Sequence, residues 1–132
     1  MSNSLEIILI DDEAIVGNRL KPALDKIGCS VEVFQNPKEA MSRIEEKEFN
    51  IVVTDIRMDE IDGMQVLEYV RGRYPKTKII MISGYAKMDV AREAMEKGAF
   101  DIIAKPFKPD DLRRSIANAA ESLGMPLAVK SN

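Results

Sequence analysis

Short apolar runs alternate along this chain with longer segments in which apolar residues recur every three or four positions. Runs of four or five residues rich in isoleucine and valine are typical of buried strands, and the longer spacing is typical of amphipathic helices. The predicted strands are residues 6–10, 30–34, 50–54, 78–82 and 101–104. The predicted helices are residues 12–27, a segment that starts at Pro37, and residues 63–73, 87–97 and 109–123.

Each predicted strand is followed by a predicted helix, which gives five β-α units. Strands joined through helices run parallel, with right-handed crossovers and helices on both faces of the sheet. The 132 residues are enough for one such domain and too few for two ordinary ones. We therefore predict a single doubly wound α/β domain over residues 6–123, preceded by an N-terminal extension (1–5) and followed by a C-terminal tail or linker start (124–132).

The residues at the strand ends carry the candidate chemistry. Asp11 and Asp12 follow the first strand, Asp55 the third, Ser83 the fourth and Lys105 the fifth. The carboxyl ends of parallel strands share one edge of the sheet, where open α/β folds place their ligands. Taken alone, each residue is as well explained by a turn, a helix cap or a solvated loop. Together they indicate a site for a hard divalent cation and a phosphoryl group.

Composition narrows the classes of function. The chain has no histidine, which excludes histidine-based acid–base catalysis and histidine metal ligation. The net charge is -3 and there is no basic run, so nothing indicates nucleic-acid binding within this span. The single cysteine, Cys29, cannot form an internal disulfide. No stretch is long and apolar enough to span a membrane and no secretion signal is present, so we expect a cytoplasmic protein.

Four motifs resemble those of a known family. They are Ile8-Leu9-Ile10-Asp11-Asp12-Glu13, Val53-Thr54-Asp55-Ile56-Arg57-Met58 followed by Asp62-Gly63, Ile82-Ser83-Gly84, and Gly98-Ala99-Phe100-Asp101 leading into Lys105-Pro106-Phe107. In this order, over about residues 6–123, the chain resembles the receiver domain of bacterial two-component response regulators. The resemblance implies a flavodoxin-like fold with strand order 2-1-3-4-5. It also implies phosphorelay signalling that switches a protein-interaction face.

The resemblance assigns roles to three of the strand-end residues. Asp55 is implied as the phosphoacceptor, Lys105 as the counter-charge of the phosphate, and Ser83 as a hydroxyl donor to a phosphoryl oxygen. A carboxylate is a usable nucleophile toward phosphorus. Such a domain assists its own phosphorylation and dephosphorylation, but we do not expect an enzyme with a dissociable substrate and product.

The resemblance also implies a Mg²⁺ (or Mn²⁺) site. Asp12, Asp55 and the backbone carbonyl of Arg57 are implied as direct ligands, and Asp11 as a ligand through water. Mg²⁺ prefers oxygen ligands and keeps some of its waters. Without the cation, repulsion between the three carboxylates should raise the pKa of at least one of them.

The implied phosphodonor is a histidine kinase or a histidine phosphotransfer protein. By analogy with the family, it docks beside the first helix and the loop after the fifth strand. The candidate contact residues are Ile15, Asn18, Arg19, Pro106 and Phe107. The face between the fourth and fifth helices is the implied output surface and a possible homodimer interface.

Two positions affect the expected switch. Three residues before Lys105, many members of the family carry an aromatic residue that changes rotamer on activation, whereas this chain has Ile102. Tyr85, two residues after Ser83, is the candidate to replace it. Tyr85 and Arg57 are also expected to flank the phosphoryl group and to hinder attack by water.

Two other classes share parts of this pattern. A flavodoxin-type electron carrier has the same fold, but the acidic loop after the first strand would repel a flavin phosphate. A hydrolase with an aspartyl-phosphate intermediate usually has its nucleophile after the first strand and a second aspartate two residues on, where this chain has Glu13. Both are weaker alternatives to the receiver domain.

Overall fold

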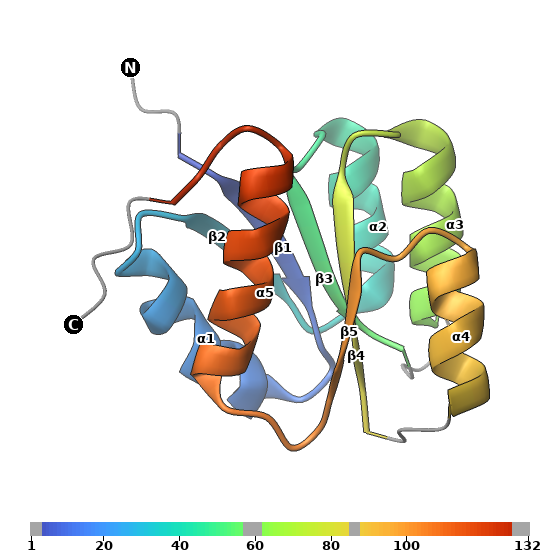
Figure 1. The fold of residues 1–132 in the computed structure, drawn as a ribbon, viewed down its shortest axis with the longest axis horizontal. Helices are drawn as coiled ribbons and strands as arrows, with labels where there is room; N and C mark the ends of the chain where they lie inside the picture. The colour runs from blue at the N-terminus through green and yellow to red at the C-terminus, as the bar shows by residue number, and fades with distance from the viewer. Residues whose placement is uncertain (1–3, 57–61, 85–87, 128–132) are drawn as a thin grey trace.

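The computed structural model describes residues 4–56, 62–84 and 88–127 (Figure 1). The strands are β1 (Glu6–Ile10), β2 (Ser30–Phe34), β3 (Ile51–Asp55), β4 (Lys78–Ser83) and β5 (Asp101–Ala104). The helices are α1 (Ala14–Asp25), α2 (Pro37–Glu46), α3 (Gly63–Arg73), α4 (Met88–Glu96) and α5 (Pro109–Ser122).

The five strands form one parallel sheet in the order β2-β1-β3-β4-β5, as predicted. The bounds of β1, β2 and β5 agree with the sequence pattern, whereas β3 begins and ends one residue later than predicted and β4 ends one residue later. Asp55 and Ser83 are therefore the last residues of their strands. Asp55 pairs with Ile82 and Ser83 pairs with Ala104. The backbone positions of both candidate site residues are thus fixed by the sheet.

Each face of the sheet has its own apolar core. Helices α1 and α5 cover one face, and α2, α3 and α4 cover the other (Figure 1). Successive residues of β1 alternate between the two cores: Ile7 and Leu9 pack beneath α1 and α5, whereas Ile8 and Ile10 pack beneath the other three helices. Because both faces are covered, the strand is apolar at every one of these positions.

Side-chain caps explain where α2 and α3 begin. The Asn36 side chain accepts hydrogen bonds from the N–H groups of Lys38 and Glu39 at the start of α2. Asp62 accepts from the N–H of Gln65, and the Gln65 side chain accepts from the N–H of Asp62, which together form a capping box. These bonds satisfy N–H groups that the first turn of a helix leaves unpaired.

Helix α1 begins two residues later than the sequence pattern predicts. The side chain of Asp11 accepts a hydrogen bond from the N–H of Glu13 at 2.9 Å and holds the chain in a turn before the helix. Glu13 is the N-cap residue, and its side chain makes no capping bond to a described residue. Neither Asp11 nor Asp12 is therefore explained as the N-cap residue, and Asp11 instead bonds the turn that leads into the helix.

The second half of α1 contains Pro22, which has no N–H to donate to the preceding turn of the helix. The helix nevertheless continues through Pro22 to Asp25. The chain leaves the helix through Gly28, whose φ of 84° lies in the left-handed region that glycine adopts without strain.

Residues just outside the predicted domain bounds pack against it. Leu5 is buried in the core beneath α1 and α5, and Met125 and Leu127 are half-buried against the same core. The Asn50 side chain accepts a hydrogen bond from the N–H of Glu6 at 2.8 Å, and its Nδ2 lies 3.5 Å from the sulfur of Met125. Leu5 and Met125 therefore contact the domain near the amino end of the sheet.

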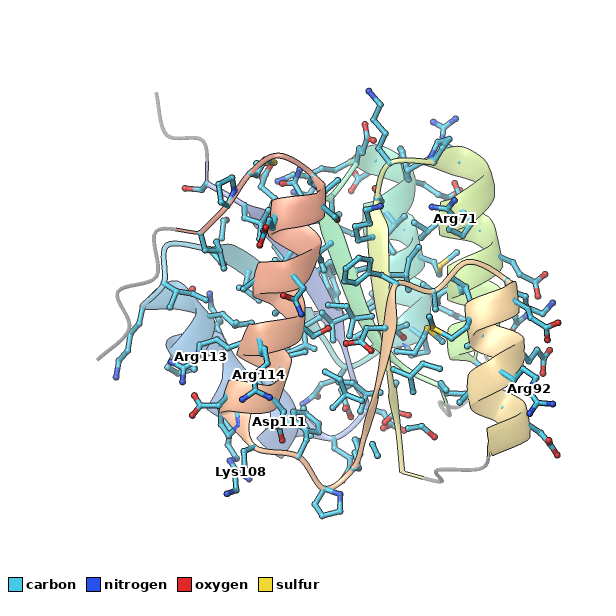
Figure 2. All side chains as sticks on the ribbon, in the orientation of Figure 1. Arg71, Arg92, Lys108, Asp111, Arg113 and Arg114 are labelled. Carbon is cyan, nitrogen blue, oxygen red and sulfur yellow. The ribbon has the colours of Figure 1, made fainter. Side chains whose placement is uncertain are left out.

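Charged side chains cover the outer surfaces of the helices. Figure 2 shows Arg92 on α4 and Arg114 on α5 pointing away from the sheet. At the start of α5, the Asp111 side chain accepts a hydrogen bond from the N–H of Lys108 at 3.0 Å. Of the helices in the described ranges, none has the length and apolar content to cross a membrane.

Candidate functional site

Four strands deliver polar side chains to one edge of the sheet. The β1–β3 pairing places Asp11 beside Asp55, and the β4–β5 pairing places Ser83 next to the strand that leads into Lys105. The N–H of Lys105 donates a hydrogen bond to the Ser83 carbonyl at 2.8 Å. Hydrogen bonds of the backbone thus hold this edge together before any side chain is considered.

The ammonium group of Lys105 lies among three carboxylates. Its Nζ is 2.6 Å from Asp55 Oδ2, 2.7 Å from Glu13 Oε1 and 3.1 Å from Asp11 Oδ2. The first two contacts are aligned hydrogen bonds. Burial lowers the pKa of Lys105, but the carboxylates outweigh it and raise that pKa well above its ordinary value. A permanent positive charge therefore faces Asp55 at neutral pH.

Asp11 is the most deeply buried acid of the site, with 1% of its surface exposed. Its Oδ2 is buried and has no aligned hydrogen-bond donor among the described residues. Burial raises the pKa of Asp11 above its ordinary value, against the hydrogen bond from Glu13 and the charge of Lys105. The charge of Asp55 makes only the smallest of these contributions. The predicted rise in a carboxyl pKa therefore occurs, but burial is its main cause rather than repulsion.

Glu13 is a partner of Lys105 that the sequence pattern did not identify. Its side chain is 59% exposed, and its hydrogen bond with Lys105 lowers the pKa of the Glu13 carboxyl. The available signal was the third acid of the Asp11-Asp12-Glu13 run. Lys105 lies 92 positions further along the chain, and the spacing of apolar residues does not predict a contact over that separation.

Carboxylate oxygens of Asp11, Asp12, Glu13 and Asp55 lie within 4.8 Å of one another. Such hard oxygen donors suit Mg²⁺ or Mn²⁺. A buried carboxylate oxygen without an aligned donor, as at Asp11, is a group that a bound cation would satisfy. The residues present therefore fit a divalent cation. The fold brings three predicted ligands together, and Arg57 lies outside the described residues.

The remaining candidates differ in their placement. Ser83 is buried at the end of β4. Ile102 is half-buried on β5 and packs against the core beneath α2, α3 and α4. Tyr85 lies outside the described residues.

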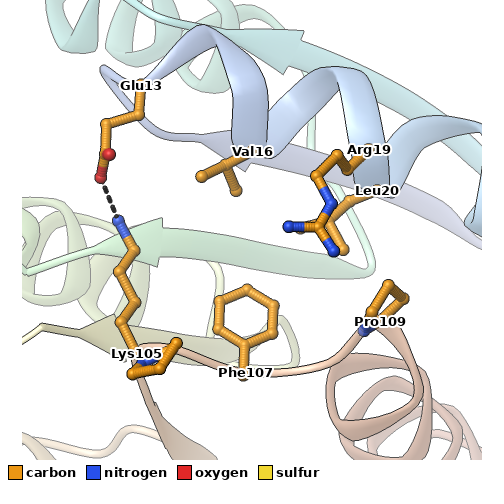
Figure 3. Close-up of a pocket in the computed structure, with 8 residues that line it drawn as sticks. Glu13, Val16, Arg19, Leu20, Lys105, Phe107 and Pro109 are labelled. Atoms are coloured by element: carbon orange, nitrogen blue, oxygen red, sulfur yellow. Dashed lines mark hydrogen bonds and ion pairs between the residues drawn. The ribbon is translucent and has the colours of Figure 1, made fainter.

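A hollow of about 290 Å³ opens beside Lys105, between α1 and the loop from β5 to α5 (Figure 3). Its lining is mostly apolar and includes three charged residues; the lining residues are Glu13, Val16, Arg19, Leu20, Lys105, Pro106, Phe107 and Pro109. Three of the predicted docking residues, Arg19, Pro106 and Phe107, are among them, whereas Asn18 is exposed on α1 outside this lining. The side chain of Ile15 lies outside the description. Val16 and Leu20 also line the hollow, although both pack against the core beneath α1 and α5.

Comparison with known proteins identifies the family. Residues 7–117 match the family model of the response regulator receiver domain. This chain belongs to that family, whose members are phospho-accepting switch domains of two-component phosphorelay signalling. An NtrX-like response regulator of Rickettsia conorii is 35% identical over 121 residues, which cover 90% of this chain and 26% of the relative. The chain thus spans about a quarter of that relative's length.

Solved structures agree with this assignment. A CheY-like receiver domain from Methanospirillum hungatei JF-1 superposes with a TM-score of 0.87 at 28% identity, covering 92% of this chain and 98% of the other. The beryllofluoride-activated NtrC4 receiver domain, a dimer in solution, has a TM-score of 0.84 at 27% identity, covering 89% and 98%. The family match supports neither a flavodoxin-type carrier nor an aspartyl-phosphate hydrolase.

Proposed function

We propose that Asp55 accepts a phosphoryl group from a phosphohistidine of a histidine kinase or a histidine phosphotransfer protein. The observation that carries this proposal is the Lys105 ammonium group, 2.6 Å from Asp55 Oδ2, beside the buried carboxylate of Asp11. A cation held next to the nucleophile offsets the negative charge that arrives with a phosphoryl group.

The proposed transfer is a single displacement at phosphorus. An oxygen of Asp55 forms a bond to phosphorus while the P–N bond of the donor breaks. The electron pair of that bond stays on the imidazole nitrogen, which takes up a proton. The signal ends when the aspartyl phosphate is hydrolysed: water attacks phosphorus, the bond to Asp55 breaks, and inorganic phosphate leaves. Because the protein is itself the acceptor, it acts as a switch and not as an enzyme with a dissociable product.

Asp12, Asp55 and the carbonyl of Arg57 would hold Mg²⁺ (or Mn²⁺) directly, and Asp11 would hold it through water. When bound, the cation supplies charge neutralisation for the phosphoryl oxygens. The side chains of the protein do the rest of the work. Lys105 binds one phosphoryl oxygen, and the Ser83 hydroxyl donates a hydrogen bond to another.

The new charge on Asp55 draws Ser83 and Lys105 inward and shifts an existing equilibrium of the face between α4 and α5. The hydrogen bond from the Lys105 N–H to the Ser83 carbonyl supports coupled movement of the two residues. We infer that this face can also form a homodimer; the related NtrC4 receiver domain is a dimer. Tyr85 and Ile102 would modulate the switch.

The phosphodonor docks at the hollow between α1 and the loop after β5. Arg19, Pro106 and Phe107 line this hollow. Ile15 and Asn18 lie on α1, the helix that also carries Arg19. We place this phosphoprotein in the bacterial cytoplasm. We assign its receiver domain to residues 6–123, with 1–5 as an extension and 124–132 as a tail or linker start.

The proposal is tested by treating the purified protein with acetyl phosphate and Mg²⁺ and measuring its intact mass. The wild type should gain one phosphoryl group, and chelation of the metal should slow the gain. Asp55→Asn should gain none, whereas Asp25→Asn, which removes an exposed carboxylate of α1, should match the wild type. Labelling that persists in Asp55→Asn would overturn the assignment of the acceptor.

A further inference from the structure

The three carboxylate partners of Lys105 are not equivalent. Asp55 and Asp11 are buried at the ends of their strands, whereas the side chain of Glu13 is 59% exposed. An ammonium group has three N–H donors. The Lys105 ammonium donates hydrogen bonds to Asp55 and Glu13 at 2.6 and 2.7 Å, and Asp11 Oδ2 is an ion-pair partner at 3.1 Å, so three carboxylates share its charge in this state.

A phosphoryl group on Asp55 adds anionic oxygens beside the same ammonium group, so it competes with these carboxylates for the charge of Lys105. Releasing Asp11 would leave a buried carboxylate with one charged partner fewer, which is costly. Releasing Glu13 returns an exposed carboxylate to water, where it is solvated. Glu13 is therefore the contact that the incoming group displaces.

The position of Glu13 supports a specific role for this contact. Glu13 is the N-cap residue of α1, yet its carboxylate makes no capping bond to a described residue. It instead extends toward the Lys105 ammonium at the edge of the hollow (Figure 3). Its backbone is held by the hydrogen bond from its N–H to Asp11 Oδ1. The Glu13 carboxylate thus bonds the Lys105 ammonium, which the phosphoryl group needs, and not the N–H groups at the start of α1.

We propose that Glu13 is a positioning residue that competes with the phosphoryl group for the Lys105 ammonium and thereby sets how readily Asp55 is phosphorylated. This inference rests on the proposed function of Asp55. Glu13 bonds Lys105 in the unphosphorylated state, and this bond breaks when the contact between the phosphoryl group and Lys105 forms.

The test is the initial rate of Asp55 phosphorylation by acetyl phosphate with saturating Mg²⁺, followed by intact mass. Glu13→Gln keeps the size of the side chain and removes its charge, so the rate should rise roughly two- to fivefold, the range that corresponds to an exposed ion pair. The difference from wild type should shrink at high salt, because salt screens an exposed pair. Glu121→Gln, an exposed charge removal on α5, should leave the rate unchanged.

A double variant separates competition for Lys105 from a general charge effect. In a Lys105→Met background, Glu13→Gln should no longer change the rate, because the residue through which it acts is gone. Acceleration of the same size in that background would overturn the inference. A slower rate together with weaker Mg²⁺ binding by calorimetry would also overturn it, and would make Glu13 a metal ligand instead.

The outcomes distinguish this inference from the function on which it rests. Absence of label from the wild type would overturn the proposed function, and this inference with it. Normal labelling of the wild type with an unchanged rate in Glu13→Gln would overturn this inference alone. Thermal unfolding of each variant checks that the fold is retained.

Discussion

Gly63 packs directly against the chain segment that carries Asp55. A β carbon at position 63 would lie 2.8 Å from the Cα of Ile56 and closer still to the carbonyl oxygen of Asp55. The N–H of Gly63 also donates a hydrogen bond to the carbonyl of Ile56 at 2.7 Å. The start of α3 therefore fixes the backbone of the candidate phosphoacceptor.

Replacing Gly63 by alanine should disturb both stability and the site. The added methyl group meets backbone atoms, which cannot move aside as a flexible side chain would, so we expect a loss of about 1–3 kcal/mol. Urea unfolding measures this loss, and acetyl phosphate labelling should show slower phosphorylation of Asp55. Gly72→Ala is the matched control in the same helix. No described atom lies within 4 Å of the added carbon there, and a gain of up to about 1 kcal/mol is expected. Equal effects of the two substitutions would contradict the close-packing argument.

Asp11→Asn should stabilise the metal-free protein at neutral pH. Burial raises the pKa of Asp11 above its ordinary value of 3.8, so protonation favours the folded state. The stability of the wild type relative to the variant is greatest below that ordinary value and declines as pH rises through the raised pKa. At pH 7 the variant should be more stable by on the order of 1 kcal/mol.

Added Mg²⁺ should reverse or narrow the difference in folding stability between the wild type and Asp11→Asn. A ligand that binds only the folded state stabilises it by mass action, and the wild type retains the carboxylate that the site needs. Thermal unfolding with Mg²⁺ and with a chelator measures both effects. A metal-free variant less stable than the wild type at pH 7 would show that the ion pair with Lys105 outweighs burial.

The Glu32–Arg43 pair links β2 to α2 and should contribute stability that acid removes. Arg43 Nε and Nη2 donate to the two oxygens of Glu32 at 2.8 and 3.0 Å. These hydrogen bonds lower the pKa of Glu32 below its ordinary value of 4.5. The contribution is therefore complete at pH 7 and is lost as pH falls below that value and through the lowered pKa.

Glu32→Gln should lose roughly 0.5–1 kcal/mol at pH 7, because both side chains are about one-third exposed. The difference in unfolding free energy between Glu32→Gln and the wild type should disappear in acid. Glu48→Gln, at an exposed position, should track the wild type at every pH. Urea titrations across pH measure the difference, and a gap that stays constant with pH would rule out the charged pair as its source.

Cys29 should react slowly with thiol reagents in the folded protein. Burial, with a smaller contribution from the charge of Asp25, raises the pKa of its thiol to about 11. At pH 8 almost none of it is the reactive thiolate. Labelling with a disulfide reagent should therefore be slow in buffer and fast in denaturant. Fast labelling of the folded protein would mean that the thiol is exposed by local opening.

Apolar spacing predicted the fold closely because burial repeats along a chain with the period of each element. The end of α1 was predicted less well than the strands, and its start was displaced by one side-chain bond from Asp11 to the N–H of Glu13. Such a bond depends on the rotamer of a single carboxylate, which hydrophobic periodicity does not encode. The convergence of Asp11, Asp12 and Asp55 was predictable because strand ends share an edge.

By itself, the sequence determined the five β-α units, the parallel sheet and the polar residues at one edge, since these follow from local patterns and from the geometry of parallel strands. Only the tertiary structure decided that Asp11 is buried while Asp12 is exposed, and that Glu13 contacts Lys105. It also decided which residues of α1 line the hollow. The physical reason is that these features depend on how loops and side chains from distant segments meet, and no single segment contains that information.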